Sequence, residues 1–363
     1  MSLIDLCIDA RMAFSAGIGT CIRQLAPLLN QPPFRVLLLV NQKEQLWCQN
    51  LEQIYFPSPI YSIQEQLYFP MKIPRCDLFW SPHYNIPLLP IRAKKKVVTI
   101  HDACHLALGD YLSLPERLYA KFVMKKALYS SNAIVTDSCF SKQELIRYLG
   151  LPKQNLSIIP PAVNRQLFQR VSNESILNEI REKYQLPSRF VLFVGSQKVH
   201  KNLHGLLKAF SNISTPNLHL VIVGKNKGLR NFVENIPAKQ VLWLGEVPEK
   251  DLPPLYSLAE IFVFPSFYEG FGLPPLEAMS CGCPTIVSNS ASLPEVCGDA
   301  SIYIDPNRLE DLSAAIHLVA SSPKIKDNLI QAGYNQVQTF SWQATANLYR
   351  QLFEETLLLP SRH

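Results

Sequence analysis

The sequence contains no apolar run long enough to cross a bilayer and no recognisable leader at its start. A membrane-spanning helix needs roughly 18 or more consecutive apolar residues, and no run in the 363-residue chain reaches that length. Residues 1–5 lack the basic region and cleavage site of a secretory signal. The nine cysteines are odd in number and scattered, which is typical of a reducing compartment rather than of a disulfide framework. We therefore expect a cytoplasmic protein.

A large excess of charge of one sign is also absent. The formal net charge is +6, with 18% charged and 47% hydrophobic residues, which is typical of a globular protein. Much of the lysine excess falls at 92–96 and in a helix-like stretch at 115–129. Aromatic residues do not alternate with these basic clusters as in a base-stacking platform, which disfavours nucleic acid as a partner.

The stretch at 115–129 predicts an amphipathic helix with two possible uses. Helical spacing places its apolar and basic side chains apart, with Leu114, Leu118, Phe122 and Val123 on one face and Arg117, Lys121, Lys125 and Lys126 elsewhere. The helix is either an ordinary part of a domain or a patch that rests on an anionic membrane surface.

The chain exceeds the roughly 250–300 residues at which single cores stop growing, so two domains are expected. Apolar strand patterns alternate with helical ones on both sides of an irregular segment at 160–175, which predicts an α/β fold. We expect two doubly wound, Rossmann-like domains that face each other across a cleft. The predicted domains are 1–165 on the acceptor side and 166–340 on the nucleotide side, with a last helix at about 341–363 packing back on the first. The expected strands are 3–8, 34–40, 77–80, 97–100, 132–136, 156–159, 189–194, 218–223, 241–244, 261–264, 284–287 and 301–304.

The first glycine loop lacks the third glycine of a dinucleotide-binding fingerprint. Gly17 and Gly19 follow a predicted strand, but position 22 is Ile22 and no acidic residue stands about 20 positions further on. A nicotinamide oxidoreductase is therefore excluded. The two glycines indicate either a tight turn or a close approach of the backbone to a ligand.

The stretch 269–277 is the strongest candidate site. Glu269 and Glu277 bracket a glycine loop that runs from a buried strand into a helix opened by two prolines. Unpaired amides at such a helix start attract anions such as phosphate, while carboxylates suit neutral hydroxylated groups such as sugars. A glycosidase-like acid–base pair is the alternative. The nearby Cys281 and Cys283 have no second Cys/His pair at metal-binding spacing, so no metal site is expected.

Two further side chains follow predicted strands. Lys201 stands near a helix start, where its charge opposes the helix dipole unless it binds an anion such as a diphosphate; a solvated lysine is the alternative. His101 ends a strand, where it either bonds locally or donates to a sugar hydroxyl.

Residues 264–287, with two glutamates separated by seven residues, resemble the signature of the retaining glycosyltransferases of family 4, which have the GT-B architecture. Looser matches at 99–102, 135–138, 158–164, 194–195 and 201–202 extend the resemblance to nearly the whole chain. The resemblance implies transfer of a hexose with retention of configuration, by front-face attack and without an essential metal.

The resemblance also implies roles for individual residues. Glu277 would hold the ribose of the nucleotide-sugar donor, and Glu269 with the amides of Phe271, Gly272 and Leu273 would engage the sugar and adjacent phosphate. The remaining roles are neutralisation of the diphosphate by Lys201, contact with the donor sugar by His101, and packing near the phosphates by Gly19.

The chain departs from the family pattern in the phosphate loop. Many members carry arginine where this chain has Ser196, so the second cation is left to Lys198 or His200. The His200–Asn202 sequence resembles mannosyltransferases that assemble bacterial surface polysaccharide, which favours GDP-mannose as donor, with no other cofactor. The expected acceptor is a glycan or lipid-linked oligosaccharide. A non-catalytic nucleotide-sugar sensor or scaffold with the same fold is the alternative function.

Overall fold

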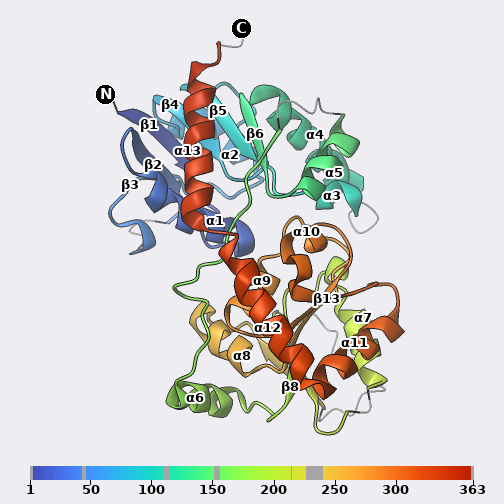
Figure 1. Cartoon of the computed structure of the whole chain (residues 1–363). Helices are drawn as coiled ribbons and strands as arrows, with labels where there is room; N and C mark the ends of the chain where they lie inside the picture. Colours follow the sequence, from blue (N-terminus) through green and yellow to red (C-terminus); the bar gives the residue numbers. More distant parts are fainter. Residues whose placement is uncertain are drawn as a thin grey trace. The chain divides into compact units, whose positions relative to one another are not determined.

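The computed structural model describes residues 3–42, 46–108, 114–150, 156–213, 215–225 and 240–360. The chain forms two compact units (Figure 1). Unit 1 comprises Met1–Pro161 together with Trp342–His363, and unit 2 comprises Ala162–Ser341. The chain therefore passes between the units twice, after Pro161 and after Ser341.

Unit 1 is built on a seven-stranded parallel sheet with the strand order β3-β2-β1-β4-β5-β6-β7. Its strands are β1 (Ile4–Asp9), β2 (Phe34–Val40), β3 (Glu52–Tyr55), β4 (Cys76–Ser81), β5 (Ala93–Thr99), β6 (Ala133–Thr136) and β7 (Leu156–Ile158). Its helices are α1 (Ala16–Leu29), η1 (Leu46–Cys48), α2 (Ile63–Lys72), α3 (Cys104–Ala107), α4 (Leu114–Ser130), α5 (Cys139–Leu149) and α13 (Trp342–Leu358).

Unit 2 is built on a six-stranded parallel sheet with the order β10-β9-β8-β11-β12-β13. Its strands are β8 (Phe190–Val194), β9 (His219–Val223), β10 (Val241–Gly245), β11 (Ile261–Phe264), β12 (Thr285–Ser288) and β13 (Ser301–Ile304). Its helices are α6 (Glu174–Tyr184), η4 (Val199–Lys201), α7 (Leu203–Ser211), η7 (Glu249–Asp251), α8 (Leu252–Leu258), α9 (Leu273–Ser280), α10 (Leu293–Cys297), η8 (Gly298–Ala300), α11 (Leu309–Ser321) and α12 (Pro323–Gln338).

Continuous apolar runs form these strands because helices cover both faces of each sheet. In β8, Phe190 and Leu192 belong to one core cluster with α8 and α9, whereas Val191 and Phe193 belong to another with α7 and α11. Alternate side chains of one strand thus enter opposite cores. The predicted fold class, two Rossmann-like α/β domains, is confirmed.

The predicted apolar face of the 115–129 helix is confirmed at Val123 but was wrong at Leu118 and Phe122. In α4, the side chains that pack inward are Ala120, Val123, Met124, Ala127 and Leu128. Leu118 and Phe122 are instead exposed, on the side that carries Lys121 and Lys125. Two of these five residues are alanines, so apolar size did not indicate the buried face. The side chain of Leu114 lies outside the described residues.

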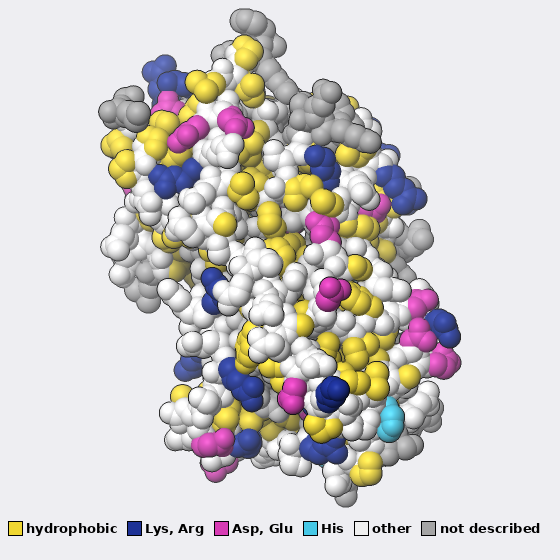
Figure 2. Space-filling view, in the orientation of Figure 1, with side chains coloured by type: hydrophobic (Ala, Val, Ile, Leu, Met, Phe, Trp, Pro, Cys, Tyr) yellow, Lys and Arg dark blue, Asp and Glu magenta, His cyan; other side chains and the backbone are white. Residues whose placement is uncertain are grey.

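The basic cluster at 92–96 is part of the sheet. It lies in β5, where Lys95 is buried and its Nζ donates to the carbonyls of Leu359 and Pro360. Lys94 pairs with Asp77 on neighbouring β4. On the face shown in Figure 2, dark blue and magenta side chains are interspersed and do not gather into one large patch of a single sign.

Helix α13 completes the core of unit 1, where it runs along the sheet (Figure 1). Tyr349 and Phe353 are buried against Trp80 of β4, and the Tyr349 hydroxyl is 2.9 Å from Thr99 Oγ1. Burial of such an aromatic side chain contributes on the order of 2–3 kcal/mol. The last helix is therefore an integral part of the unit formed by the start of the chain.

A candidate nucleotide-sugar site

Glycines line the carboxyl edge of the unit 2 sheet. Gly195, Gly224 and Gly245 follow or end β8, β9 and β10, and Gly224 N donates to Gly245 O at 2.7 Å. Gly224 has φ +141°, and a Cβ there would lie 2.0 Å from Gly195 O. Only glycine allows the loops to approach so closely, which leaves this edge lined mainly by backbone.

Lys201 lies at this edge because the backbone between β8 and α7 turns sharply. Residues Val199–Lys201 form one 3-10 turn, and Asn202 then adopts φ +53°. The side-chain Nδ2 of Asn202 donates to Pro306 O at 2.9 Å. The turn is joined to the loop after β11 by Phe267 N, which donates to His200 O at 2.7 Å. This contact brings the lysine to the first glutamate of the signature.

Lys201 and Glu269 form a mostly buried ion pair. Lys201 Nζ lies 2.7 and 2.9 Å from the two carboxylate oxygens of Glu269, and 4.9 Å from the centroid of the Phe264 ring. The two side chains are 17% and 11% exposed. This pairing gives Lys201 a partner inside unit 2, where the sequence indicated either a bound anion or solvent. Phe264 was not predicted as part of the site.

The signature loop is held by a buried serine that sequence reasoning missed. Ser292 Oγ donates to the carbonyls of Glu269 and Phe271, at 2.9 and 2.8 Å. Gly272 has φ +111°, and a Cβ there would lie 2.7 Å from Leu293 Cδ2. These contacts set the loop before α9, so the Leu273 amide at the start of α9 stands at the carboxyl edge of β11, whereas the two prolines that follow it have no N–H to offer. Leu273 begins this helix, with Pro274 and Pro275 in its first turn.

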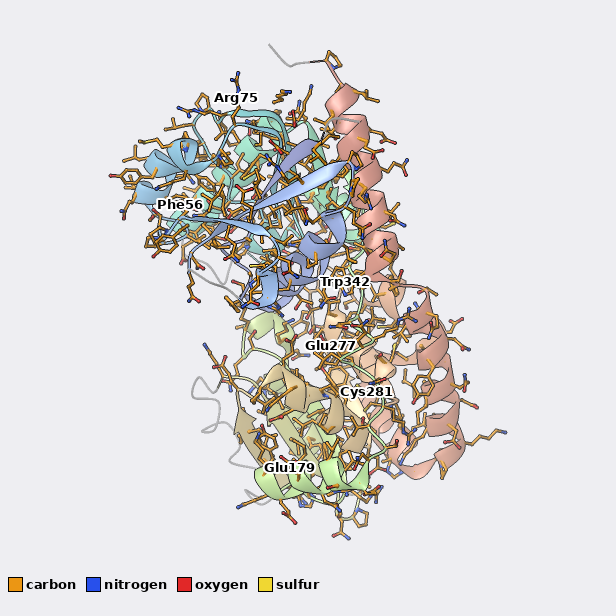
Figure 3. The ribbon with its side chains drawn as sticks, turned by 90° about the vertical axis from the view of Figure 1, so that its left-hand side faces the viewer. Phe56, Arg75, Glu179, Glu277, Cys281 and Trp342 are labelled. Carbon is orange, nitrogen blue, oxygen red and sulfur yellow. The ribbon has the colours of Figure 1, made fainter. Side chains whose placement is uncertain are left out.

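Glu277 lies on the next turn of α9 (Figure 3). Burial raises the pKa of its carboxyl to about 7, and Glu249 adds to the rise. The Tyr256 hydroxyl donates to Glu277 Oε2 at 3.1 Å, which acts in the opposite direction on this pKa. Tyr256 precedes Glu277 by 21 positions, and no sequence pattern marked it.

The candidates for a second cation lie in the turn between β8 and α7. Ser196 and Lys198 are exposed there, and His200 is partly exposed. Lys198 directly precedes the 3-10 turn that carries Lys201.

Cys281 and Cys283 are buried at the end of α9. Among the residues that the structure describes, no group of three His, Cys, Asp or Glu side chains is arranged to hold a metal ion.

Two predicted site residues belong to unit 1. Gly19 lies in the first turns of α1, where a Cβ would meet Ala13 O at 2.4 Å. Close packing within its own loop therefore explains this glycine without a ligand.

His101 follows β5, and both of its ring nitrogens have partners: Nδ1 lies 2.7 Å from Asp137 Oδ2 and Nε2 lies 2.9 Å from Pro82 O. To donate to a sugar, His101 would have to give up the Pro82 contact.

The Asp137 partner makes His101 a cation at neutral pH. Burial alone would lower its pKa, but the charge of Asp137 and the hydrogen bond to it dominate and raise the pKa to about 9. The unfolded value is about 6.5, so the pair contributes its full stabilisation below pH 6.5 and loses it as the pH rises through 9.

We expect Asp137→Asn to destabilise the protein by about 2 kcal/mol at pH 6 and by much less at pH 10. Thermal unfolding at several pH values measures this difference. Glu174→Gln, which removes the exposed partner of Arg181, is the matched control and should change little at either pH. An equal loss at both pH values for Asp137→Asn would contradict the assignment of a charged His101.

Both units match models of known protein families. The family model described as Glycosyltransferase Family 4 matches residues 15–167, and that described as Glycosyl transferases group 1 matches residues 178–336. The chain is 35% identical over 277 residues to O-antigen chain mannosyltransferase B of Escherichia coli, covering 73% of this chain and 72% of that protein. It is 30% identical over 267 residues to the serotype-specific mannosyltransferase WbdA of Escherichia coli, covering 70% of this chain and 32% of that protein.

A solved structure shares the fold. Anabaena Alr3699/HepE, determined in complex with UDP and glucose, matches with a TM-score of 0.77 at 17% identity, covering 97% of this chain and 99% of that one. At this identity the likeness concerns the fold alone. It agrees with the two parallel-sheet units described above.

Proposed function

The chain belongs to the glycosyltransferases of family 4, and from this premise we propose that it transfers mannose from GDP-mannose to a glycan or lipid-linked acceptor. The relatives named above are mannosyltransferases, and the first of them acts on an O-antigen chain. Assembly of a bacterial surface polysaccharide or lipopolysaccharide, on the cytoplasmic side of the membrane, fits these relatives.

The observation that carries the proposal is the arrangement at the carboxyl edge of the unit 2 sheet. Lys201, the Leu273 amide at the start of α9 and Glu277 occupy adjacent strand ends, β8 and β11. A cation and a helix N-terminus suit a diphosphate. A carboxylate one helical turn further on suits the two hydroxyls of a ribose. These groups together match the polar half of a nucleoside diphosphate sugar.

The chain's own residues then account for transfer by positioning and electrostatics. Lys201 and the Leu273 amide at the start of α9 would stabilise the negative charge that develops on the leaving diphosphate. Glu269, turned toward the sugar, would orient its hydroxyls. We assign neither glutamate to proton transfer and propose retention of configuration without an essential metal.

The test is binding and turnover with a panel of nucleotides and nucleotide sugars. Calorimetric titration should detect GDP with higher affinity than UDP or ADP, and NMR of the product from GDP-mannose should show the retained anomer in the presence of EDTA. Binding of none of the nucleotides would overturn the proposal. Preferential binding of UDP would overturn the choice of donor alone.

We also propose that unit 1 rests on an anionic membrane through α4 and α2. On α4, Leu118 and Phe122 are 58% and 60% exposed between lysines. On α2, the spacing of Ile63, Leu67 and Met71 places a second exposed apolar stripe along the helix. Exposed large apolar side chains of this number are uncommon on a surface without a partner.

Two observations favour a membrane as the occupant of this surface. Burial raises the pKa of Tyr119 on α4, and Glu65 of α2 and the adjoining Tyr61 add to the rise, which shows an electrostatic interaction between the two helices. Exposed lysines flank both apolar stripes: Lys72 on α2, and Lys121 and Lys125 on α4. Apolar side chains among lysines suit the headgroup region of an anionic bilayer. In the described part of the chain, no helix is long and apolar enough to cross a membrane.

Vesicle sedimentation tests this surface. The protein should pellet with vesicles that contain an anionic phospholipid and remain in solution with neutral ones, and Leu118→Glu with Phe122→Glu should reduce the pelleted fraction severalfold. Leu318→Glu, at an exposed apolar position on α11 of unit 2, is the matched control. Equal sedimentation of all three proteins would remove the proposal.

A further inference from the structure

Tyr256 is a fully buried tyrosine whose hydroxyl reaches the candidate ribose-binding carboxylate. It lies on α8, which packs against α9, and its hydroxyl donates to Glu277 Oε2 at 3.1 Å. Its ring meets the edges of Phe168 and Phe262, at centroid distances of 6.2 and 5.4 Å. These aromatic contacts leave the ring no room to turn, so the position of the hydroxyl is set by the core.

The hydrogen bond from Tyr256 uses only one of the two carboxylate oxygens of Glu277. Tyr256 approaches Oε2, and Glu277 itself is only partly exposed. A carboxylate on a short helix has several rotamers, and a hydrogen bond from a fixed donor selects one of them. A carboxylate held before the ligand arrives loses less conformational entropy on binding.

We propose that Tyr256 is a positioning residue for the nucleoside half of the donor: it holds the Glu277 carboxylate ionised and oriented toward the ribose hydroxyls. This inference rests on the proposed function, in which Glu277 binds the ribose. Tyr256 itself does not touch the donor. Its effect passes entirely through Glu277.

The surroundings of Glu277 explain why the carboxylate needs this support. Burial disfavours its ionised form, and the charge of Glu249 on η7 acts in the same direction. The thiol of Cys281, at the end of α9, and the hydroxyl of Tyr256 on α8 are the other titratable groups described as interacting with it. Burial and Glu277 raise the pKa of Tyr256 far above its usual value, so this hydroxyl remains a donor at every pH of interest. The tyrosine therefore opposes the burial effect on Glu277.

The experiment is calorimetric titration of GDP into the wild type, three variants and one control variant between pH 5.5 and 9. Tyr256→Phe removes the hydroxyl and keeps the ring in the core. The pH at which the affinity for GDP begins to decline on acidification should rise by about one unit. The affinity of this variant should therefore be about tenfold below that of the wild type at pH 6 and approach it at pH 9. Glu277→Gln should abolish this decline. In the double variant, Tyr256→Phe should add no further loss, because it acts through Glu277.

Tyr349→Phe is the matched control, because Tyr349 is also buried and also bonds through its hydroxyl, to Thr99 in unit 1. It should leave GDP affinity unchanged at every pH. A Tyr256→Phe profile equal to the wild type, or an equal loss on the Glu277→Gln background, would overturn the inference alone. Absence of GDP, UDP and ADP binding by the wild type would overturn the proposed function and this inference with it.

Discussion

Replacement of Lys201 with methionine will lower the rate of mannosyl transfer by roughly a thousandfold. Methionine keeps most of the apolar stem that lies against Phe264 but removes the ammonium group. The loss reflects the diphosphate charge that then develops without a cation beside it. Initial rates with GDP-mannose under saturating acceptor measure this effect.

Two controls separate charge from folding in this experiment. Lys201→Met leaves the Glu269 carboxylate without its partner, so Lys201→Met combined with Glu269→Gln restores neutrality at the pair. Lys208→Met removes an exposed lysine from α7, one helix further along the same chain segment. The double variant should recover the thermal stability that the single one loses while remaining as inactive, and Lys208→Met should be fully active. Activity regained in the double variant would assign Lys201 a structural role only.

The second large effect is expected for Glu277→Gln, which will weaken GDP binding by roughly a hundredfold at pH 8. A carboxylate accepts two charged hydrogen bonds from vicinal hydroxyls, each contributing at least about 1.5 kcal/mol, and glutamine can accept with only one of its terminal atoms. Glu310→Gln, at an exposed position on α11, is the control and should bind normally.

The pH dependence and a modified nucleotide sharpen this test. Because the pKa of Glu277 is raised to about 7, its ionised form declines as the pH falls through 7, and wild-type affinity should decline with it. The variant should show no such limb. Wild-type protein should bind 2′,3′-dideoxy-GDP about as weakly as the variant binds GDP, and the variant should not distinguish the two nucleotides. A variant that still prefers GDP would show that Glu277 does not contact the ribose.

The elements that sequence patterns predicted correctly share one property. Strands such as β2 and β9 are continuous apolar runs, and a run of that kind is buried wherever helices cover both faces of a sheet. In contrast, β3 (Glu52–Tyr55) has no buried residue, and α2 exposes Ile63, Leu67 and Met71 while it buries Glu65 beside Phe69. The sequence analysis missed both elements, because they do not follow the usual pattern in which apolar side chains are buried and polar ones are exposed.

Helix α2 shows how an unpredicted element can be specified by charge. Glu65 is fully buried there because it accepts hydrogen bonds from Arg11 at 2.7 Å and from Asn85 at 2.9 Å. Arg11 also pairs with Asp9 at the end of β1 and lies over the rings of Phe56 and Phe69. Arg11 and Asn85 lie 54 and 20 positions from Glu65 in the sequence, so no local pattern predicts that they pair with it.

Local sequence patterns were sufficient to predict the fold class and the family, and they selected Glu269, Glu277 and Lys201 as site candidates, because such patterns depend on spacing within one strand, one loop and one helix. The contacts that these groups make follow from the tertiary structure. It paired Lys201 with Glu269, occupied both nitrogens of His101 and placed Tyr256 against Glu277. Such contacts join residues on different elements, and their energies depend on burial and on partner distance, which appear only when strands from distant parts of the chain lie side by side.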